Sequence, residues 1–129
     1  MSSERNPYHY RAEVSYSGDL CHPEVVLVCD KRYYLPGRFQ VSRYNIPWVV
    51  PMLNTLLARD SFEGYTVGFG YTSRVVVCSG GRGNLLQFVC PGMAEAQHAA
   101  LVIQNLFNNV NAKQKKRRAT DTMEVAHDV

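Results

Sequence analysis

Residues 74–110 carry the pattern that most constrains how this chain can fold. Two short β-type runs, 75–77 and 85–89, flank a glycine-rich segment at 80–83, which predicts a β-hairpin with a loop of about five residues. Pro91 and Gly92 then interrupt the second strand. Apolar side chains follow at steps of three and four residues, which places them on one helix face: Ala96, Ala99, Ala100, Ile103, Leu106, Phe107 and Val110. A hairpin followed by an amphipathic helix predicts a sheet with one covered face.

Five further segments have the composition of strands. Residues 11–17 and 38–42 alternate between apolar and polar side chains, as half-buried strands do, and residues 33–35 are expected to form a partner strand. The run 24–29 is almost continuously apolar, so we expect a central strand buried on both faces. Residues 65–71 alternate large side chains with threonine and glycine, which predicts a nearly bare face that a neighbouring backbone or a flat ligand can approach.

A first helix is expected between residues 45 and 59. Its apolar side chains recur with helical spacing: Trp48, Val49, Met52, Leu53, Leu56 and Leu57. Asn45 fits an N-cap, and Pro47 is tolerated in the first turn. Pro51 is harder to place, because a proline inside a helix costs about 3 kcal/mol or more. The helix either includes Pro51 or begins there after an irregular turn.

Together these segments predict a single α+β domain over residues 11–112, with an antiparallel sheet of about six to seven strands and two helices packed on one face. Residues 1–10 are expected to form a flexible lead-in, and residues 113–129 a disordered tail that is first basic and then acidic. A shift of 49 residues places Phe39 on Phe88. A duplicated ββ(β)α unit is one interpretation of this self-match, and chance among common apolar residues is the other.

This order of elements is similar to that of several nucleic-acid binders that hold a strand on an open sheet, including PUR-type repeats, the Whirly group and the TATA-binding protein. The similarity lies in topology. It implies a free sheet face opposite the helices. No motif of these families matches this chain residue by residue, so the similarity implies no particular binding positions.

The net charge of +3 is distributed unevenly. Residues 113–118 hold five of the 14 basic residues and residues 119–129 hold three of the 11 acidic ones, which leaves nine basic and eight acidic residues in 1–112. The basic block is typical of a nuclear-import signal bound by an importin-type receptor, or of a phosphate contact: Lys113, Lys115, Lys116, Arg117 and Arg118. A solvated charge run is the alternative. We expect a protein of the nucleus, or of nucleus and cytoplasm.

Arginine and tyrosine side chains gather on and beside the expected strands. Eight of the nine basic residues in 1–112 are arginines, which suit bidentate phosphate contacts, and tyrosine rings can stack on unpaired bases. The residues selected as nucleic-acid contacts are Arg32, Tyr33, Arg38, Arg43, Tyr65, Tyr71, Arg74 and Arg82. Surface ion pairs and ordinary sheet packing are the alternatives, and core packing is favoured for Phe39, Phe69 and Phe88. For the glycine-rich loop, a hairpin tip is the first interpretation and contact with a nucleic-acid backbone the second.

The sequence favours a non-enzymatic protein that needs no metal or cofactor. Its four cysteines, at 21, 29, 78 and 90, contain no CxxC pair, so a zinc site is not expected. The acidic residues show no paired motif. The N-terminus has no apolar segment typical of a secretory signal, and no apolar run approaches the ~18 residues of a membrane span.

The last helix has no formally charged side chain between Glu95 and Lys113, whereas a solvent-facing helix usually carries charges. We therefore expect a homodimer contact, or cover by the first helix, at Leu101, Val102 and Asn105. The leading hypothesis is a regulatory protein that binds single-stranded or distorted DNA or RNA. The alternative is a protein–protein interaction module, a regulatory or viral accessory adaptor, that docks a partner through its sheet or this uncharged helix.

Overall fold

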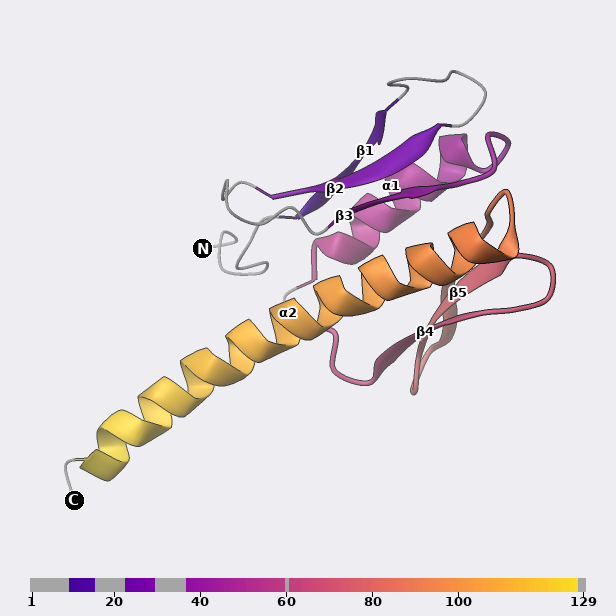
Figure 1. Ribbon diagram of the computed structural model, residues 1–129. Helices are drawn as coiled ribbons and strands as arrows, with labels where there is room; N and C mark the ends of the chain where they lie inside the picture. The colour runs from indigo at the N-terminus through magenta and orange to yellow at the C-terminus, as the bar shows by residue number, and fades with distance from the viewer. Residues whose placement is uncertain (1–9, 16–22, 30–36, 60, 128–129) are drawn as a thin grey trace.

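The computed structural model describes residues 10–15, 23–29, 37–59 and 61–127, with side chains described as far as residue 112. The order of elements is three strands, a helix, three strands and a helix (Figure 1). Their bounds are β1 Arg11–Ser15, β2 Glu24–Val28, β3 Gly37–Gln40, α1 Ile46–Leu57, β4 Tyr65–Phe69, β5 Arg74–Ser79, β6 Gly83–Val89 and α2 Met93–His127. The predicted α+β class is confirmed, as is the hairpin followed by a helix. The strand expected at 33–35 lies outside the described residues.

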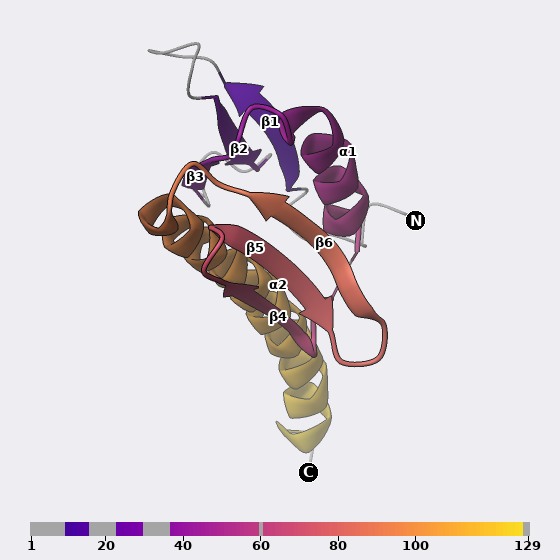
Figure 2. The same cartoon turned by 90° about the vertical axis from the view of Figure 1, so that its right-hand side faces the viewer.

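The strands form two antiparallel sheets of three strands, β1-β2-β3 and β4-β5-β6, which corrects the expectation of one larger sheet. Each helix contacts both sheets: α1 lies against β1 and β6, and α2 lies against β3, β4 and β5 (Figure 1, Figure 2). The helices therefore do not share one face of one sheet. β3 has four residues, and all four pair with β2. Among the described residues, one backbone hydrogen bond joins the two halves here, from the Ser42 N–H to the Val89 carbonyl (2.8 Å).

The core is built from one face of each sheet and the inner faces of both helices. Val25 and Leu27 of β2 are buried while their neighbours are half-buried, so this strand is not covered on both faces as expected. The apolar positions predicted for the last helix are all buried: Ala96, Ala99, Ala100, Ile103, Leu106, Phe107 and Val110. Phe39 of β3 stacks on Phe88 of β6, with ring centroids 5.7 Å apart. The two sheets therefore share one core.

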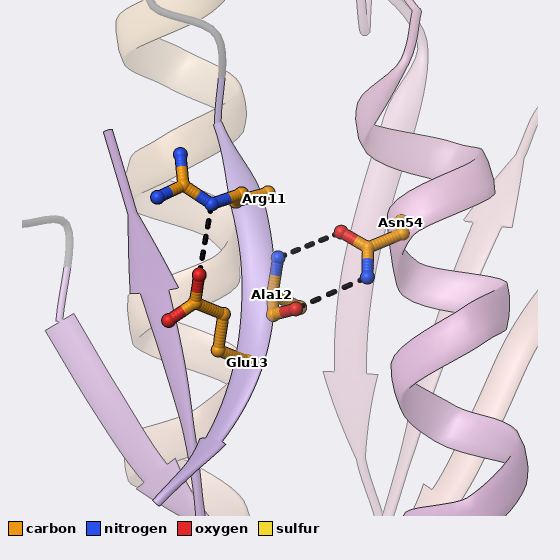
Figure 3. A network of polar contacts seen from close by, with 4 residues as sticks. All are labelled: Arg11, Ala12, Glu13 and Asn54. Carbon is orange, nitrogen blue, oxygen red and sulfur yellow. Dashed lines mark hydrogen bonds and ion pairs between the residues drawn. The ribbon is translucent and has the colours of Figure 1, made fainter. Parts of the chain in front are cut away.

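An amide side chain from a helix holds the edge strand of each sheet. Asn54 of α1 accepts a hydrogen bond from the Ala12 N–H (2.8 Å) and donates one to the Ala12 carbonyl (3.0 Å), as Figure 3 shows. Gln104 of α2, 50 residues later in the chain, accepts a hydrogen bond from the Val67 N–H in β4 (3.2 Å). Because an unpaired strand edge is a template for pairing with another chain, these contacts protect the middle of β1 and of β4.

Helix α1 begins at Ile46, so the alternative of a short helix that starts at Pro51 is excluded. Pro51 lies on the exposed side of α1, where water can bond the Pro47 carbonyl that lacks its helical N–H partner. Asn45 precedes the helix but its side chain does not cap it. The Asn45 Oδ1 instead accepts a hydrogen bond from the Val89 N–H (2.9 Å). The predicted N-cap residue therefore ties the start of α1 to the end of β6.

Helix α2 continues through the basic block to His127. Residues 113–127 contain neither glycine nor proline and are rich in lysine, arginine and alanine, which are good helix formers. Figure 1 shows this part of α2 extending away from the sheets. The side chains of the basic block lie outside the described part of the chain.

Candidate nucleic-acid interface

Two turns from different halves of the chain meet at the end of β6: the β3–α1 turn and the β4–β5 turn. The Ser42 N–H of the β3–α1 turn donates to the Val89 carbonyl (2.8 Å), and the Cys90 N–H donates to the Ser73 carbonyl of the β4–β5 turn (2.8 Å). The two turns are thus bonded to consecutive residues. Side chains that they carry therefore extend from the same end of the second sheet.

Aromatic and cationic side chains are exposed in and beside these two turns. Tyr44, in the β3–α1 turn, is 82% exposed, and Tyr71, in the β4–β5 turn, is 100% exposed. The Arg43 guanidinium lies 5.9 Å from the centroid of the Tyr44 ring, within the range of a cation–π contact. Arg74, the first residue of β5, donates from Nη1 to Gln87 Oε1 over a long 3.5 Å, which leaves its other donors available. We call Arg43, Tyr44, Tyr71 and Arg74 the turn cluster.

The β4–β5 turn is closed by its own backbone. The Ser73 N–H donates to the Gly70 carbonyl and the Gly70 N–H donates to the Arg74 carbonyl, each over 3.0 Å. Ser73 has a φ of 59°, in the left-handed region that residues other than glycine rarely adopt. Because these bonds fix the backbone, Tyr71 needs to lose the freedom of only two side-chain torsions when its ring binds a ligand.

The face of the second sheet that points away from the helices carries small side chains. We call it the open face. The strand registers place Gly68, Val76 and Gln87 in one row, with Thr66 and Cys78 in the next. A Cβ at Gly68 would meet no atom within 4 Å, so the space above it is free. The bare strand face predicted from the alternation of large and small residues is therefore present, and it adjoins the turn cluster at the start of β5.

The outer face of the first sheet is electrically balanced. The Arg38 guanidinium lies 3.6 Å from the Glu24 carboxylate, and Arg11 Nε lies 2.8 Å from Glu13 Oε2 (Figure 3). The Arg38 carbonyl is also bonded to His98 Nε2 (2.9 Å). Arg38, which the sequence selected as a phosphate contact, therefore has a carboxylate beside it that competes with a phosphate.

Tyr65 lies on the helix-covered face of β4 rather than on the open face. Its ring packs edge-on against Phe62 and Phe107, with centroids 5.4 and 5.8 Å apart. This corrects its expected placement, since the alternation in β4 defines two faces without saying which one the helix covers. Phe69, expected in the core, lies on the same face of β4 as Tyr65 but is the last residue of the strand, and it is 43% exposed.

Arg82 lies in the β5–β6 loop, at the opposite end of β5 from Arg74. Its N–H donates to the Ser79 Oγ (3.1 Å) and to the Ser79 carbonyl (3.3 Å). The glycine-rich loop is therefore a closed turn, and its Arg82 amide is already bonded. Arg32 and Tyr33 lie outside the described residues.

The sequence pattern did not identify Tyr44 or Gln87 as candidate nucleic-acid contacts. Tyr44 stands next to Arg43 in a segment with turn character, which is a weak local signal. Its position beside the β4–β5 turn depends on bonds between residues far apart in the chain, and sequence spacing does not show these.

The cysteines of the described residues contribute to packing. Burial, together with the nearby Glu95 carboxylate, raises the pKa of the Cys90 thiol from its ordinary value of 9.0 to about 12. The thiol is therefore protonated at neutral pH and is a weak nucleophile. The Cys78 Sγ lies 3.0 Å from Asn84 Oδ1 on the open face. Within the described ranges, no group of three or more His, Cys, Asp or Glu side chains is placed to hold a metal ion.

The outer face of α2 contains two of the three residues predicted for a dimer contact. Leu101 is 57% exposed and Asn105 is exposed, but Val102 is buried. A Cβ at Gly37 of β3 would lie 3.2 Å from two Val102 methyl carbons. Val102 therefore packs within the fold and is not available to a partner. None of the helices searched over the described residues is long and apolar enough to cross a membrane.

Comparisons with protein-family models, with curated proteins and with solved structures gave no match. A functional assignment therefore rests on the turn cluster and the open face themselves.

Proposed function

We propose that this chain is a non-enzymatic regulatory protein of the nucleus that binds single-stranded or distorted nucleic acid through the turn cluster and the open face. The observation that carries the proposal is that two exposed tyrosines and two arginines lie in or directly beside two turns that are bonded to one strand end. Aromatic rings stack on unpaired bases for about 1–3 kcal/mol each, and arginine binds phosphate oxygens with two parallel hydrogen bonds. Bases stacked inside a regular duplex are not accessible to such rings, which favours single strands.

The distribution of charge supports the same surface. Of the residues that the structure describes, no acidic one lies on the open face or in the two turns, whereas the first sheet pairs its arginines with glutamates. An array of phosphates is therefore attracted to the second sheet more than to the first. In this proposal the basic block at 113–118 supplies further phosphate contacts and the signal for an importin-type receptor.

Fluorescence anisotropy with a labelled 15-nucleotide oligothymidine, and with a duplex of the same length, tests the proposal. Tyr44→Ala and Tyr71→Ala should each weaken single-strand binding about 5-fold to 150-fold, the equivalent of one lost stacking contact. Tyr44→Phe and Tyr71→Phe are the matched controls and should retain most of the affinity, because the ring makes the contact. Arg74→Gln should lower the salt slope by about 0.7. Alanine variants that bind as well as the wild type would contradict the proposal.

We propose further that the two halves are a duplicated βββα unit. Several observations support this. The residues that hold the edge strands, Asn54 and Gln104, are 50 positions apart, and Phe39 and Phe88, which stack on each other, are 49 apart. The buried positions of α1, moved by 50, coincide with buried positions of α2: 46, 49, 53, 56 and 57 with 96, 99, 103, 106 and 107. Under this proposal, only the second half developed an open face without acidic side chains.

The second candidate function is a protein–protein adaptor, and the exposed Leu101 on the uncharged outer side of α2 favours it. Under this hypothesis α2 docks a partner or a second copy of the chain. Light scattering over a concentration series separates these arrangements. A mass that stays at 14.6 kDa would exclude the homodimer.

A further inference from the structure

Helix α1 presents an apolar outer side. No side chain between Ile46 and Leu57 carries a formal charge. Trp48 is 37% exposed and Met52 is 43% exposed, one helical turn apart on the same side. A surface helix of an ordinary domain carries charged residues on its solvent side. The uncharged outer side of α1 therefore indicates a surface that binds a partner.

A groove runs between α1 and β6 along this side of the helix. It contains a cavity of about 170 Å³ that is lined by Met52, Thr55, Leu56, Arg59 and Leu85. Thr55 and Leu56 lie three and four residues after Met52, and Arg59 lies four and three residues after them, so the four share one helix face. Leu85 comes from the place where a register shift interrupts the pairing of β5 with β6, and it is partly buried against the core.

The groove has the length of a short helix. Trp48 is exposed one helical turn before Met52, outside the cavity itself. The surface from Trp48 to Arg59 spans about 16 Å at 1.5 Å per residue. This is about three turns of a partner helix. Helices that bind in such grooves use apolar side chains at positions i, i+3 or i+4 and i+7.

Among the described residues that line the cavity, Arg59 is the one that carries a charge. Its side chain is half-buried at the C-terminal end of the lining, and no carboxylate of the described residues pairs with it. A single half-buried guanidinium without a partner favours a ligand with one carboxylate at this end. One cation is too few for a chain of phosphates, which needs several neutralising contacts.

We propose that the groove between α1 and β6 binds an amphipathic helix of another protein, with its apolar side chains on Trp48, Met52 and Leu85 and an aspartate or glutamate against Arg59. A second copy of this chain fits the groove less well. In a symmetric contact the same surface occurs on both sides, so each Arg59 would face apolar groups or another Arg59. The proposal does not depend on nucleic-acid binding. The groove lies toward the C-terminal end of α1, near Arg59, whereas Arg43 and Tyr44 of the turn cluster precede the N-terminal end of α1.

Selection from a phage-displayed library of random 16-residue peptides tests this proposal. The full chain is the target, and the Met52→Glu variant serves for counter-selection. We expect the enriched peptides to carry apolar residues at helical spacing with an Asp or Glu near one end. A library that yields no enriched sequence, or one enriched in basic residues, overturns the proposal.

The synthetic form of the most enriched peptide then supplies the affinity measurement. Trp48 is the only tryptophan in the chain, so its emission should shift to shorter wavelength as the peptide covers it. Met52→Glu should weaken binding at least 10-fold. Arg59→Glu should weaken it about 10-fold, and a peptide with Lys in place of its acidic residue should restore it. Tyr71→Ala, in the turn cluster, should leave the affinity unchanged.

Two further outcomes decide against the proposal. If Arg59→Glu binds the original peptide as well as the wild type does, the carboxylate contact is excluded. If light scattering shows a dimer that Met52→Glu converts to a monomer, the occupant of the groove is a second copy. Circular dichroism of the variants establishes that they keep the fold, which is expected because Met52 is an exposed side chain.

Discussion

Gly37 and Gly68 are both strand glycines, but only one of them has a neighbour in the space where a side chain would be. Gly37 has a φ of +131°, and its Cβ would lie 3.2 Å from Val102. At Gly68 that space is empty. We therefore expect Gly37→Ala to lower the free energy of unfolding by about 1–3 kcal/mol, through strain and overpacking. Gly68→Ala should change it by less than about 1 kcal/mol. Urea unfolding of both variants checks this, and equal effects would contradict it.

Cys90 makes the stability of the fold dependent on alkaline pH. Its pKa is raised to about 12 in the folded state, so between pH 9 and 12 the thiol ionises in the unfolded chain but not in the folded one. The stabilising contribution is complete below pH 9. It decreases as the pH rises toward 12, by up to about 1.4 kcal/mol per pH unit. The difference in unfolding free energy between the wild type and Cys90→Ala should therefore become smaller from pH 8 to pH 10.5. A constant difference would show that burial does not shift this thiol.

Tyr65 and Tyr71 show which features of a single residue the sequence pattern predicts and which depend on the fold. Tyr65 and Tyr71 belong to the same alternating segment, and both were selected as stacking residues. In the structure Tyr65 packs on Phe62 and Phe107, and Tyr71 is wholly exposed. The period of two residues assigned Tyr65 to one face of a strand. The position of α2 decided that this face is covered, and the tight turn at Ser73 decided that Tyr71 leaves the strand.

At the scale of elements, the edge strands depend on amide side chains from the helices. Asn54→Ala would leave both the N–H and the carbonyl of Ala12 without these partners, so we expect a loss of about 1–3 kcal/mol in unfolding free energy. Gln104→Ala removes one bond to Val67 and should cost about 0.5–1.5 kcal/mol. The exposed Thr55, whose hydroxyl bonds only the Pro51 carbonyl, is the control, and its change to Ala should stay within about 0.5 kcal/mol. The measurement is the urea midpoint of each variant.

These amide contacts also test the duplication. If the two halves are equivalent units, Asn54→Ala and Gln104→Ala should both destabilise the fold more than Thr55→Ala does. An Asn54→Ala variant as stable as Thr55→Ala would remove the main structural argument for equivalence.

Most of the helices and strands could be predicted from the sequence, because the strands 24–28 and 74–79 and the buried stripe of α2 follow local periodicity. The bond from Asn45 to Val89 was not predictable, because it joins residues 44 positions apart.

At the scale of the whole molecule, the basic part of α2 separates the two candidate functions. A chain cut after Ala112 should keep single-strand binding through the turn cluster, with weaker affinity and a lower salt slope because five cations are removed. Complete loss of binding would assign the nucleic-acid contact to the basic block and leave the folded body as an adaptor. Fluorescence anisotropy at several salt concentrations distinguishes these results.

The same block is expected to direct nuclear import. A fusion of the chain to a fluorescent protein should accumulate in the nucleus, and replacement of the five basic residues by alanine should distribute it evenly. A fusion large enough to be excluded from passive entry provides the control. Equal nuclear accumulation of both forms would contradict the assignment.

The sequence by itself determined the α+β class, the hairpin before the long helix and the residues that the helix buries, because these follow from periodicities of two and of 3.6 residues. Tertiary structure decided that the strands form two sheets, since strand pairing and the packing of each helix against both halves depend on contacts between distant segments. It also decided which of the described arginines lie beside a carboxylate. Arg38 pairs with Glu24 across neighbouring strands, whereas Arg43 and Arg74 lie in and beside two turns that backbone hydrogen bonds join to the end of β6.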